Sequence, residues 1–170
     1  VNPSAPFTTS TLQQSASTRY KYNAKMTMNI AQQLYNKGYI TYMRTDSTSI
    51  SKEAHENIKD VIMREYGDKY YEYRTFINKK NNTQESHECI RPTKLDKIEI
   101  KGTPEEKKLY DLIYKRTIQS QMKSAEYQSI KLEIEMLEEK ILENYKLIGT
   151  LDNLIFEGFM ILDGKKGKDR

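Results

Sequence analysis

Two short polar clusters in this sequence contain the residue types that could do chemistry. One runs from Tyr42 to Ser47, and the other runs from His87 to Thr93. Pro92 forces the second cluster to be a loop, because proline lacks a backbone donor and disfavours a helical residue before it. Binding and catalytic side chains often lie on loops beside ordered elements, so these clusters are the candidate sites.

The first cluster combines a tyrosine with an arginine two residues away. A tyrosine hydroxyl has a pKa of about 10, so it is a poor nucleophile at neutral pH unless a cation or a base assists it. In an extended segment, residues i and i+2 face the same side, so Tyr42 and Arg44 could address one phosphate together. The chain has thirteen tyrosines, however, and spacing alone favours a half-buried packing residue at Tyr42.

A helix is expected before this tyrosine and another after it. The first spans about residues 18–37 and ends where Gly38 can cap it, and its apolar stripe comprises Met26, Ile30, Ala31, Leu34 and Tyr35. Residues 39–43 are short, β-branched and aromatic, which predicts an extended segment. The second helix spans about residues 51–66, with Ser51 or Ser49 as its cap, Gly67 as its terminator and His55 on its surface.

The remaining elements predict an α+β fold. Residues 7–12 are rich in β-branched and hydroxyl side chains, which predicts an entering strand. A third helix is predicted to start at Thr103, which can form a capping box with Glu106, and Pro104 occupies the first helical position. This helix continues to about Ala125. Alternating apolar residues then predict at least two antiparallel strands and a third over residues 154–161. Because strands flank the helical block, we expect residues 7–12 to lie beside the strands of the 130–161 region.

Composition excludes several classes of protein. The single cysteine, Cys89, excludes an internal disulfide framework and a cysteine-rich zinc site, and it fits a reducing compartment. The chain has no run of eighteen apolar residues and no basic and apolar blocks of a signal peptide, so we expect a soluble protein without a membrane partner.

The excess positive charge lies in the first fifty residues. Five cations stand there against one acid, Asp46. A polyanion is expected to dock on such a region, although a solvated basic helix face explains the same charges. A non-catalytic nucleic-acid module of the helix-turn-helix or winged-helix type is therefore an alternative function. It should prefer duplex DNA and tolerate loss of the Tyr42 hydroxyl.

Several segments together resemble one family. The run Gly-Tyr-Ile-Thr-Tyr-Met-Arg-Thr-Asp-Ser at residues 38–47 is similar to the active-site segment of type IA DNA topoisomerases. Residues 6–14 and 87–93 resemble the segment before it and the histidine-containing loop after it. Residues 109–122 match the following helix, and residues 156–159 add a weaker similarity. The resemblance therefore spans nearly the whole chain.

The resemblance implies a role for each matching residue. Tyr42 would attack a single-stranded phosphodiester and remain joined to the 5′ phosphate, while Arg44 would hold the scissile phosphate. The DNA-binding positions would be Thr41, Thr45 and Asp46, which support that site, and His87, Arg91 and Gln32, which contact the DNA backbone. Asn36 and Cys89 stand where glutamate and alanine are usual in the family, and Met43 favours a topoisomerase I-like member.

The resemblance also implies partners that this chain lacks. The family binds Mg²⁺ in a Toprim domain, and we expect no metal ligands in this chain. Residues 1–16 would be the entering strand of an arch domain, and residues 17–115 would be a helical domain, with the active-site tyrosine, that is inserted between arch strands. Residues 116–163 would be the returning helix end and the β-strands of the arch domain, and residues 164–170 a disordered tail. We expect a fragment that is inactive alone, from a protein that is cytoplasmic and nucleoid-associated if it is bacterial.

Overall fold

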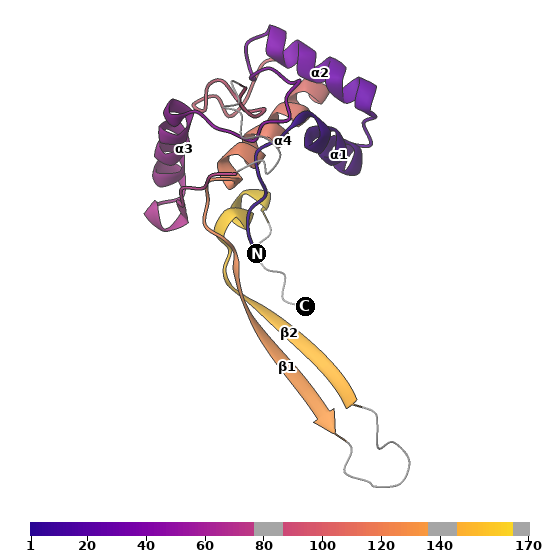
Figure 1. The fold of residues 1–170 in the computed structure, drawn as a ribbon, viewed down its shortest axis with the longest axis vertical. Coiled ribbons are helices and arrows are strands. Elements are labelled where there is room, and N and C mark those ends of the chain that lie inside the picture. The colour runs from indigo at the N-terminus through magenta and orange to yellow at the C-terminus, as the bar shows by residue number, and fades with distance from the viewer. Residues whose placement is uncertain (77–86, 136–145, 165–170) are drawn as a thin grey trace.

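The computed structural model describes residues 1–76, 87–135 and 146–164, which form a helical body and a long β-hairpin (Figure 1). The elements in chain order are α1 (Thr9–Tyr20), α2 (Ala24–Asn36), α3 (Lys52–Glu65), the 3-10 helix η1 (Asp68–Tyr70), α4 (Pro104–Gln119), β1 (Glu126–Glu135), β2 (Lys146–Phe156) and the 3-10 helix η2 (Gly158–Asp163). The predicted α+β class is confirmed. Residues 78–82, which suggested an exposed loop, and residues 165–170 of the predicted tail lie outside the described residues.

Helix α4 runs through the middle of the body. Helices α2 and α3 pack against it, and α1 packs against α2 (Figure 1). Fully buried leucine and isoleucine side chains from three helices meet in the core: Leu34, Ile58, Ile62, Leu109, Ile113 and Ile118. Burial of one such side chain contributes about 1.5–3 kcal/mol, so the core fixes α2 firmly. The tyrosine segment leaves from the end of that fixed helix.

The predicted entering strand is wrong from Thr9 onwards, where α1 begins. Thr8 caps this helix, because its hydroxyl accepts a hydrogen bond from the Thr11 backbone N–H at 3.4 Å. The Thr11 hydroxyl in turn accepts from the Thr8 N–H at 2.9 Å, which completes a capping box. The hydroxyl-rich run is thus a helix start, because its side chains satisfy free backbone donors.

The single helix predicted over residues 18–37 is two helices. Lys21 adopts a left-handed conformation with φ of 61°, which ends α1. The Asn23 side chain then accepts a hydrogen bond from the first turn of α2 and starts a new helix. The predicted end of α2 is confirmed, since Gly38 follows it with φ of 72°. Within the expected apolar stripe, Ile30, Ala31 and Leu34 are buried, whereas Met26 and Tyr35 are exposed.

Helices α3 and α4 begin where predicted. Ser51 caps α3, and Thr103 caps α4 through its capping box. Helix α4 ends at Gln119 and not near Ala125: the Gln121 and Met122 N–H groups donate only three residues back, each at 3.1 Å, and Met122 then forms a bridge with Tyr71. Residues 121–123 then run in extended form beside residues 70–72, where the Lys123 N–H donates to the Tyr70 carbonyl at 2.8 Å. A helix would use these backbone groups internally and could not make this contact.

The prediction that His55 lies on the helix surface is wrong. Its side chain is buried, and its ring packs against Tyr73 with centroids 4.7 Å apart. Burial lowers the pKa of His55 from its ordinary value of 6.5, although a hydrogen bond with Gln121 opposes this shift. The segment that follows α3 covers this face, which helical periodicity within α3 alone does not indicate.

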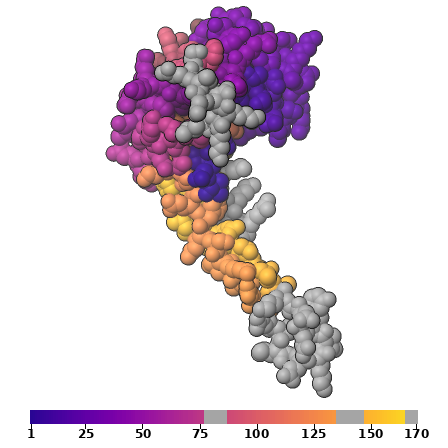
Figure 2. Space-filling view, viewed as in Figure 1, coloured from indigo at the N-terminus to yellow at the C-terminus, as the bar shows by residue number. Residues whose placement is uncertain are grey.

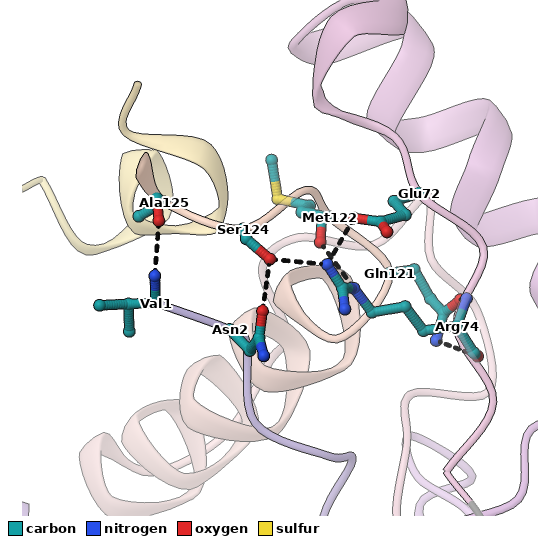
Figure 3. Close-up of polar contacts among 8 residues, drawn as sticks. All are labelled: Val1, Asn2, Glu72, Arg74, Gln121, Met122, Ser124 and Ala125. Carbon is teal, nitrogen blue, oxygen red and sulfur yellow. Dashed lines mark hydrogen bonds and ion pairs between the residues drawn. The ribbon is translucent and has the colours of Figure 1, made fainter. Parts of the chain in front are cut away.

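A polar junction joins the body to the base of the hairpin (Figure 3). The Arg74 guanidinium donates to Ser124 Oγ at 2.8 Å, to the Met122 carbonyl at 3.3 Å and to the Glu72 carboxylate. The Gln121 side-chain amide forms two hydrogen bonds with the Arg74 backbone: it accepts from the Arg74 N–H at 3.0 Å and donates to the Arg74 carbonyl at 3.1 Å. These contacts hold residues 72–74 against residues 121–124.

The hairpin projects from the body as a narrow arm (Figure 2). Strands β1 and β2 are antiparallel, with Ile130 opposite Leu151 and Ile134 opposite Leu147. The predicted third strand is wrong, because β2 ends at Phe156 and the next residues form η2. No helix in residues 1–76, 87–135 or 146–164 is long and apolar enough to cross a membrane.

The expectation that residues 7–12 lie beside the hairpin strands is also wrong. Phe7 instead forms an antiparallel bridge with Ile90, inside the body. Val1 is the residue that reaches the hairpin base: its amino group donates to the Ala125 carbonyl at 2.6 Å, and the Ala125 N–H donates to the Val1 carbonyl at 2.9 Å. Phe7, six residues after Val1, already lies inside the helical body.

Candidate active site

Three segments that are distant in sequence meet around Tyr42. Residues 7–9, 38–49 and 89–93 lie side by side, joined by the Phe7–Ile90 and Ile40–Pro92 bridges. The Ile90 N–H donates to the Phe7 carbonyl at 2.8 Å, and the Thr93 N–H donates to the Tyr39 carbonyl at 3.0 Å. The two candidate clusters of the sequence therefore form one site.

The residues from Thr41 to Ser49 form a loop, which we call the tyrosine loop, and both of its ends are tied to Cys89. The Thr41 hydroxyl donates to the Cys89 carbonyl at 2.7 Å, and the Cys89 N–H donates to the Ser49 carbonyl at 2.9 Å. The Thr41 N–H also donates to the Arg91 carbonyl at 2.9 Å. Cys89 therefore holds the two ends of the tyrosine loop together.

Thr9 anchors the middle of the tyrosine loop. Its hydroxyl donates to the Met43 carbonyl at 2.7 Å and accepts from the Thr45 N–H at 2.9 Å. The Thr9 N–H also donates to the Thr45 carbonyl at 2.9 Å. These bonds fix the peptide groups on both sides of Arg44, so the start of α1 positions a cation that lies 35 residues away in sequence.

Alternate side chains of the tyrosine loop face opposite ways. Met43 is buried in the core, whereas Tyr42 and Arg44 on either side of it are exposed. The exposed fraction of Tyr42 is 45%, so its hydroxyl can be reached from solvent. Its ring lies edge-on to Tyr35 of α2, with centroids 5.3 Å apart. An exposed tyrosine two residues from an exposed arginine is a combination suited to attack on an anionic phosphorus centre.

Arg91 is ion-paired within the site. Its guanidinium lies 2.6 Å from the Glu88 carboxylate, and Glu88 also accepts from the Ser51 N–H at 2.7 Å. Burial opposes ionisation of Glu88, but the hydrogen bonds from Arg91 and Ser51 outweigh it and lower the pKa of its carboxyl. The buried Nε of Arg91 has no partner among the described residues. Arg91 can meet an added anion only through its remaining N–H groups or by releasing Glu88.

The other predicted site residues lie around the tyrosine loop. The Thr45 hydroxyl accepts from the Ser47 N–H at 3.0 Å and shapes the turn, and Asp46 is exposed between them. Gln32 donates to the Asn36 side chain at 2.8 Å on the face of α2 that also carries Tyr35. His87 is exposed, two residues before the Cys89 anchor.

Cys89 contributes its backbone and not its thiol. The side chain is buried, and burial raises the pKa of the thiol to about 12. Within the described ranges, no three His, Cys, Asp or Glu side chains are grouped so that they could hold a metal ion.

Thr9 and Tyr35 are the two site residues that the sequence reasoning missed. Thr9 belongs to a hydroxyl-rich run whose capping spacing, from Thr8 to Thr11, indicates a helix start. Tyr35 falls on the apolar stripe of α2, and its place at the end of that stripe, directly before the tyrosine segment, is the signal that could have identified it.

The fold and this site define a class of protein. A family model described as DNA topoisomerase matches residues 1–170, and the chain belongs to the type IA DNA topoisomerase family. It is 46% identical to DNA topoisomerase 1 of Vibrio cholerae over 98% of this chain, and 44% identical to the "DNA topoisomerase 1 type prokaryotic" of Acanthamoeba polyphaga mimivirus over 94% of this chain.

A solved structure has the same fold. Full-length topoisomerase I from Thermotoga maritima superposes with a TM-score of 0.80 at 33% identity, over 99% of this chain and 28% of that protein. The chain spans 19% of the length of the Vibrio and mimivirus relatives. Most of each relative therefore lies beyond the region that this chain matches.

Proposed function

We propose that this chain is the nucleophile-bearing part of a type IA topoisomerase that cleaves and rejoins single-stranded DNA and so relaxes negative supercoils. The observation that carries this proposal is the tyrosine loop, whose ends and middle are hydrogen-bonded while Tyr42 and Arg44 remain exposed. A nucleophile on an anchored backbone, two residues from a cation, lowers the entropy and charge barriers of phosphoryl transfer.

In the proposed step, Tyr42 Oη bonds to the phosphorus and the bond from phosphorus to the 3′ oxygen breaks. The tyrosine loses its proton and the departing 3′ oxygen takes one up, which leaves a 5′-phosphotyrosine and a free 3′ hydroxyl. Arg44 balances the charge that develops on the non-bridging oxygens. The reverse step rejoins the strand. Gln32, His87 and Arg91 contact neighbouring phosphates, while Thr41, Thr45 and Asp46 support the loop.

The proposed enzyme needs further domains of the same polypeptide. The family implies Mg²⁺ bound by a Toprim domain, and the described residues of this chain contain no group of three side chains that could hold a metal ion. We also propose that the helical body is inserted between strands of an arch domain. The pairing of Val1 with Ala125 supports this, because the chain before α1 and the chain after α4 meet at the hairpin base. The chain alone is expected to be inactive.

Covalent trapping tests the function. The chain is mixed with 3′-labelled single-stranded DNA in Mg²⁺ buffer, with and without a separately produced Toprim domain, and is then denatured. Labelled protein is expected only when both pieces are present. Tyr42→Phe should abolish it, whereas Tyr39→Phe, which removes another hydroxyl from the same segment, should not.

The alternative function predicts a different pattern. A helix-turn-helix-like module would give no adduct with either piece, would prefer duplex over single-stranded DNA, and would bind equally well after Tyr42→Phe. This pattern would overturn the proposed function.

A further inference from the structure

Tyr35 and Tyr42 form an aromatic pair on the surface of the molecule. Their ring centroids are 5.3 Å apart and their planes meet at 67°, which is an edge-to-face contact. Both side chains are exposed, Tyr35 at 41% and Tyr42 at 45%. Edge-to-face rings attract because the positive edge of one meets the negative face of the other. The pair therefore has a preferred geometry without being part of the core.

The backbone contacts of the tyrosine loop hold the main chain on both sides of Tyr42 but leave its side chain free to rotate. Thr41 is held by Cys89 and Arg91, and the Met43 carbonyl is held by Thr9. These bonds fix where the Tyr42 side chain leaves the chain. Rotation of the side chain about its own bonds can still move the hydroxyl through a wide arc, and the ring that contacts Tyr42 is that of Tyr35.

Tyr35 is itself held in place. It sits in the last turn of α2, which is fixed to the core by the neighbouring, fully buried Leu34. Its carbonyl accepts from the Gly38 N–H at 2.8 Å, in the turn that leads to the tyrosine loop. One residue after the helix, Lys37 forms an ion pair of 2.6 Å with the buried Glu106 of α4. The end of α2 is thus a rigid base for the ring.

We propose that Tyr35 is a positioning residue, whose ring holds the ring of Tyr42 so that the hydroxyl faces the scissile phosphodiester. This inference rests on the proposed function, since it presupposes that Tyr42 is the nucleophile. The contact needs the ring of Tyr35 and not its hydroxyl. Loss of the ring should therefore slow cleavage of bound DNA without weakening the binding of DNA.

The test uses the intact polypeptide that contains this chain. The cleavage rate of a labelled single-stranded oligonucleotide is measured in a single turnover at saturating enzyme, and the Kd is measured by fluorescence anisotropy. Tyr35→Ala is expected to reduce the rate on the order of 10- to 100-fold at unchanged Kd, because small displacements of a reacting group have effects of that size. Tyr35→Phe, which keeps the ring, should retain the rate.

Two controls separate this effect from loss of the fold. The side chain of Tyr35 lies outside the core, so Tyr35→Ala should leave the Tm unchanged. Tyr73→Ala removes an exposed ring from another aromatic pair, that with His55, and should leave the cleavage rate unchanged.

The outcomes are distinct. A wild-type rate in Tyr35→Ala would overturn the inference, and so would a raised Kd at an unchanged rate, which would indicate a platform for a DNA base. An equal loss in Tyr35→Phe would also overturn it. An adduct that persists in Tyr42→Phe would instead refute the proposed function, whatever the Tyr35 variants do.

Discussion

Thr9 connects the start of a helix to the peptide groups on either side of Arg44. One hydroxyl serves two partners, since it donates to the Met43 carbonyl and accepts from the Thr45 N–H. A partly buried polar group that loses its partner costs about 1–3 kcal/mol. The hydroxyl should therefore matter both for the stability of the chain and for the orientation of the arginine.

Thr9→Val, which keeps the shape of the side chain and removes the hydroxyl, should lower the free energy of unfolding by about 1–3 kcal/mol. Thr9→Ser keeps the oxygen and should lie close to the wild type. Urea unfolding followed by circular dichroism measures both variants. Equal stability of the valine and serine variants would show that the hydroxyl does not anchor the loop.

Individual residues of the site were predictable to different degrees. Extended geometry predicts that Tyr42 and Arg44 share a side, and both are exposed with the buried Met43 between them, although the chain bends at Thr41 and Met43. The contacts of Thr9 and Tyr35 with the loop were not predictable from spacing, because they join segments through the tertiary fold. Whether His87 and Gln32 contact DNA stays a prediction.

At the scale of elements, two glycines with positive φ provide a matched pair. Gly158 has φ of 49° at the start of η2, and Gly164 has φ of 64° at its end. A β-carbon at Gly158 would collide with the carbonyl oxygens of Lys123 and Ser124, whereas one at Gly164 would meet nothing within 4 Å. The turn after the hairpin therefore requires a glycine at Gly158 for two separate reasons.

In both glycine-to-alanine variants, the left-handed conformation should lower the free energy of unfolding by about 1–2 kcal/mol. Gly158→Ala should lower the free energy of unfolding by roughly a further 1–3 kcal/mol, as overpacking does, because the backbone at Lys123 and Ser124 must move away from the added β-carbon. The difference between the two urea midpoints isolates this collision. Equal midpoints would mean that the backbone at residues 123–124 yields freely.

The sequence predicted elements where their ends are encoded locally. Ser51, Thr103 and Gly38 mark helix ends by cap chemistry, and all three predictions are confirmed. The end of α4 and the supposed third strand were wrong, because the paths of residues 121–125 and 157–163 depend on packing against distant segments. Phe159, for example, donates its N–H to the Lys123 carbonyl at 3.0 Å.

At the scale of the whole molecule, the hairpin presents an apolar face to solvent. The side chains that share this face are all exposed: Ile130, Leu132, Ile134, Leu147 and Leu151. The middle of the opposite face pairs polar residues, Ser129 with Asp152 and Lys131 with Thr150, while Ile148 lies opposite Glu133 farther along. An apolar face of this kind promotes association of the isolated chain.

Leu132→Lys combined with Ile134→Lys should reduce both the binding of an apolar fluorescent dye and the self-association seen in sedimentation velocity. Ser129→Lys combined with Thr150→Lys adds the same charge to the opposite face and serves as the control. Equal behaviour of the two double variants would mean that net charge, and not the apolar face, governs association.

The pairing of Val1 with Ala125 has a consequence for how a longer chain folds. The two residues exchange hydrogen bonds across a sequence separation of 124 residues, so the folded body between them holds these two points of the chain together. Loop-closure entropy grows with the number of unfolded residues between two points that are brought together, and folding of the body removes that flexibility. Further hydrogen bonds formed next to the Val1–Ala125 pair therefore do not have to close a long loop of unfolded chain.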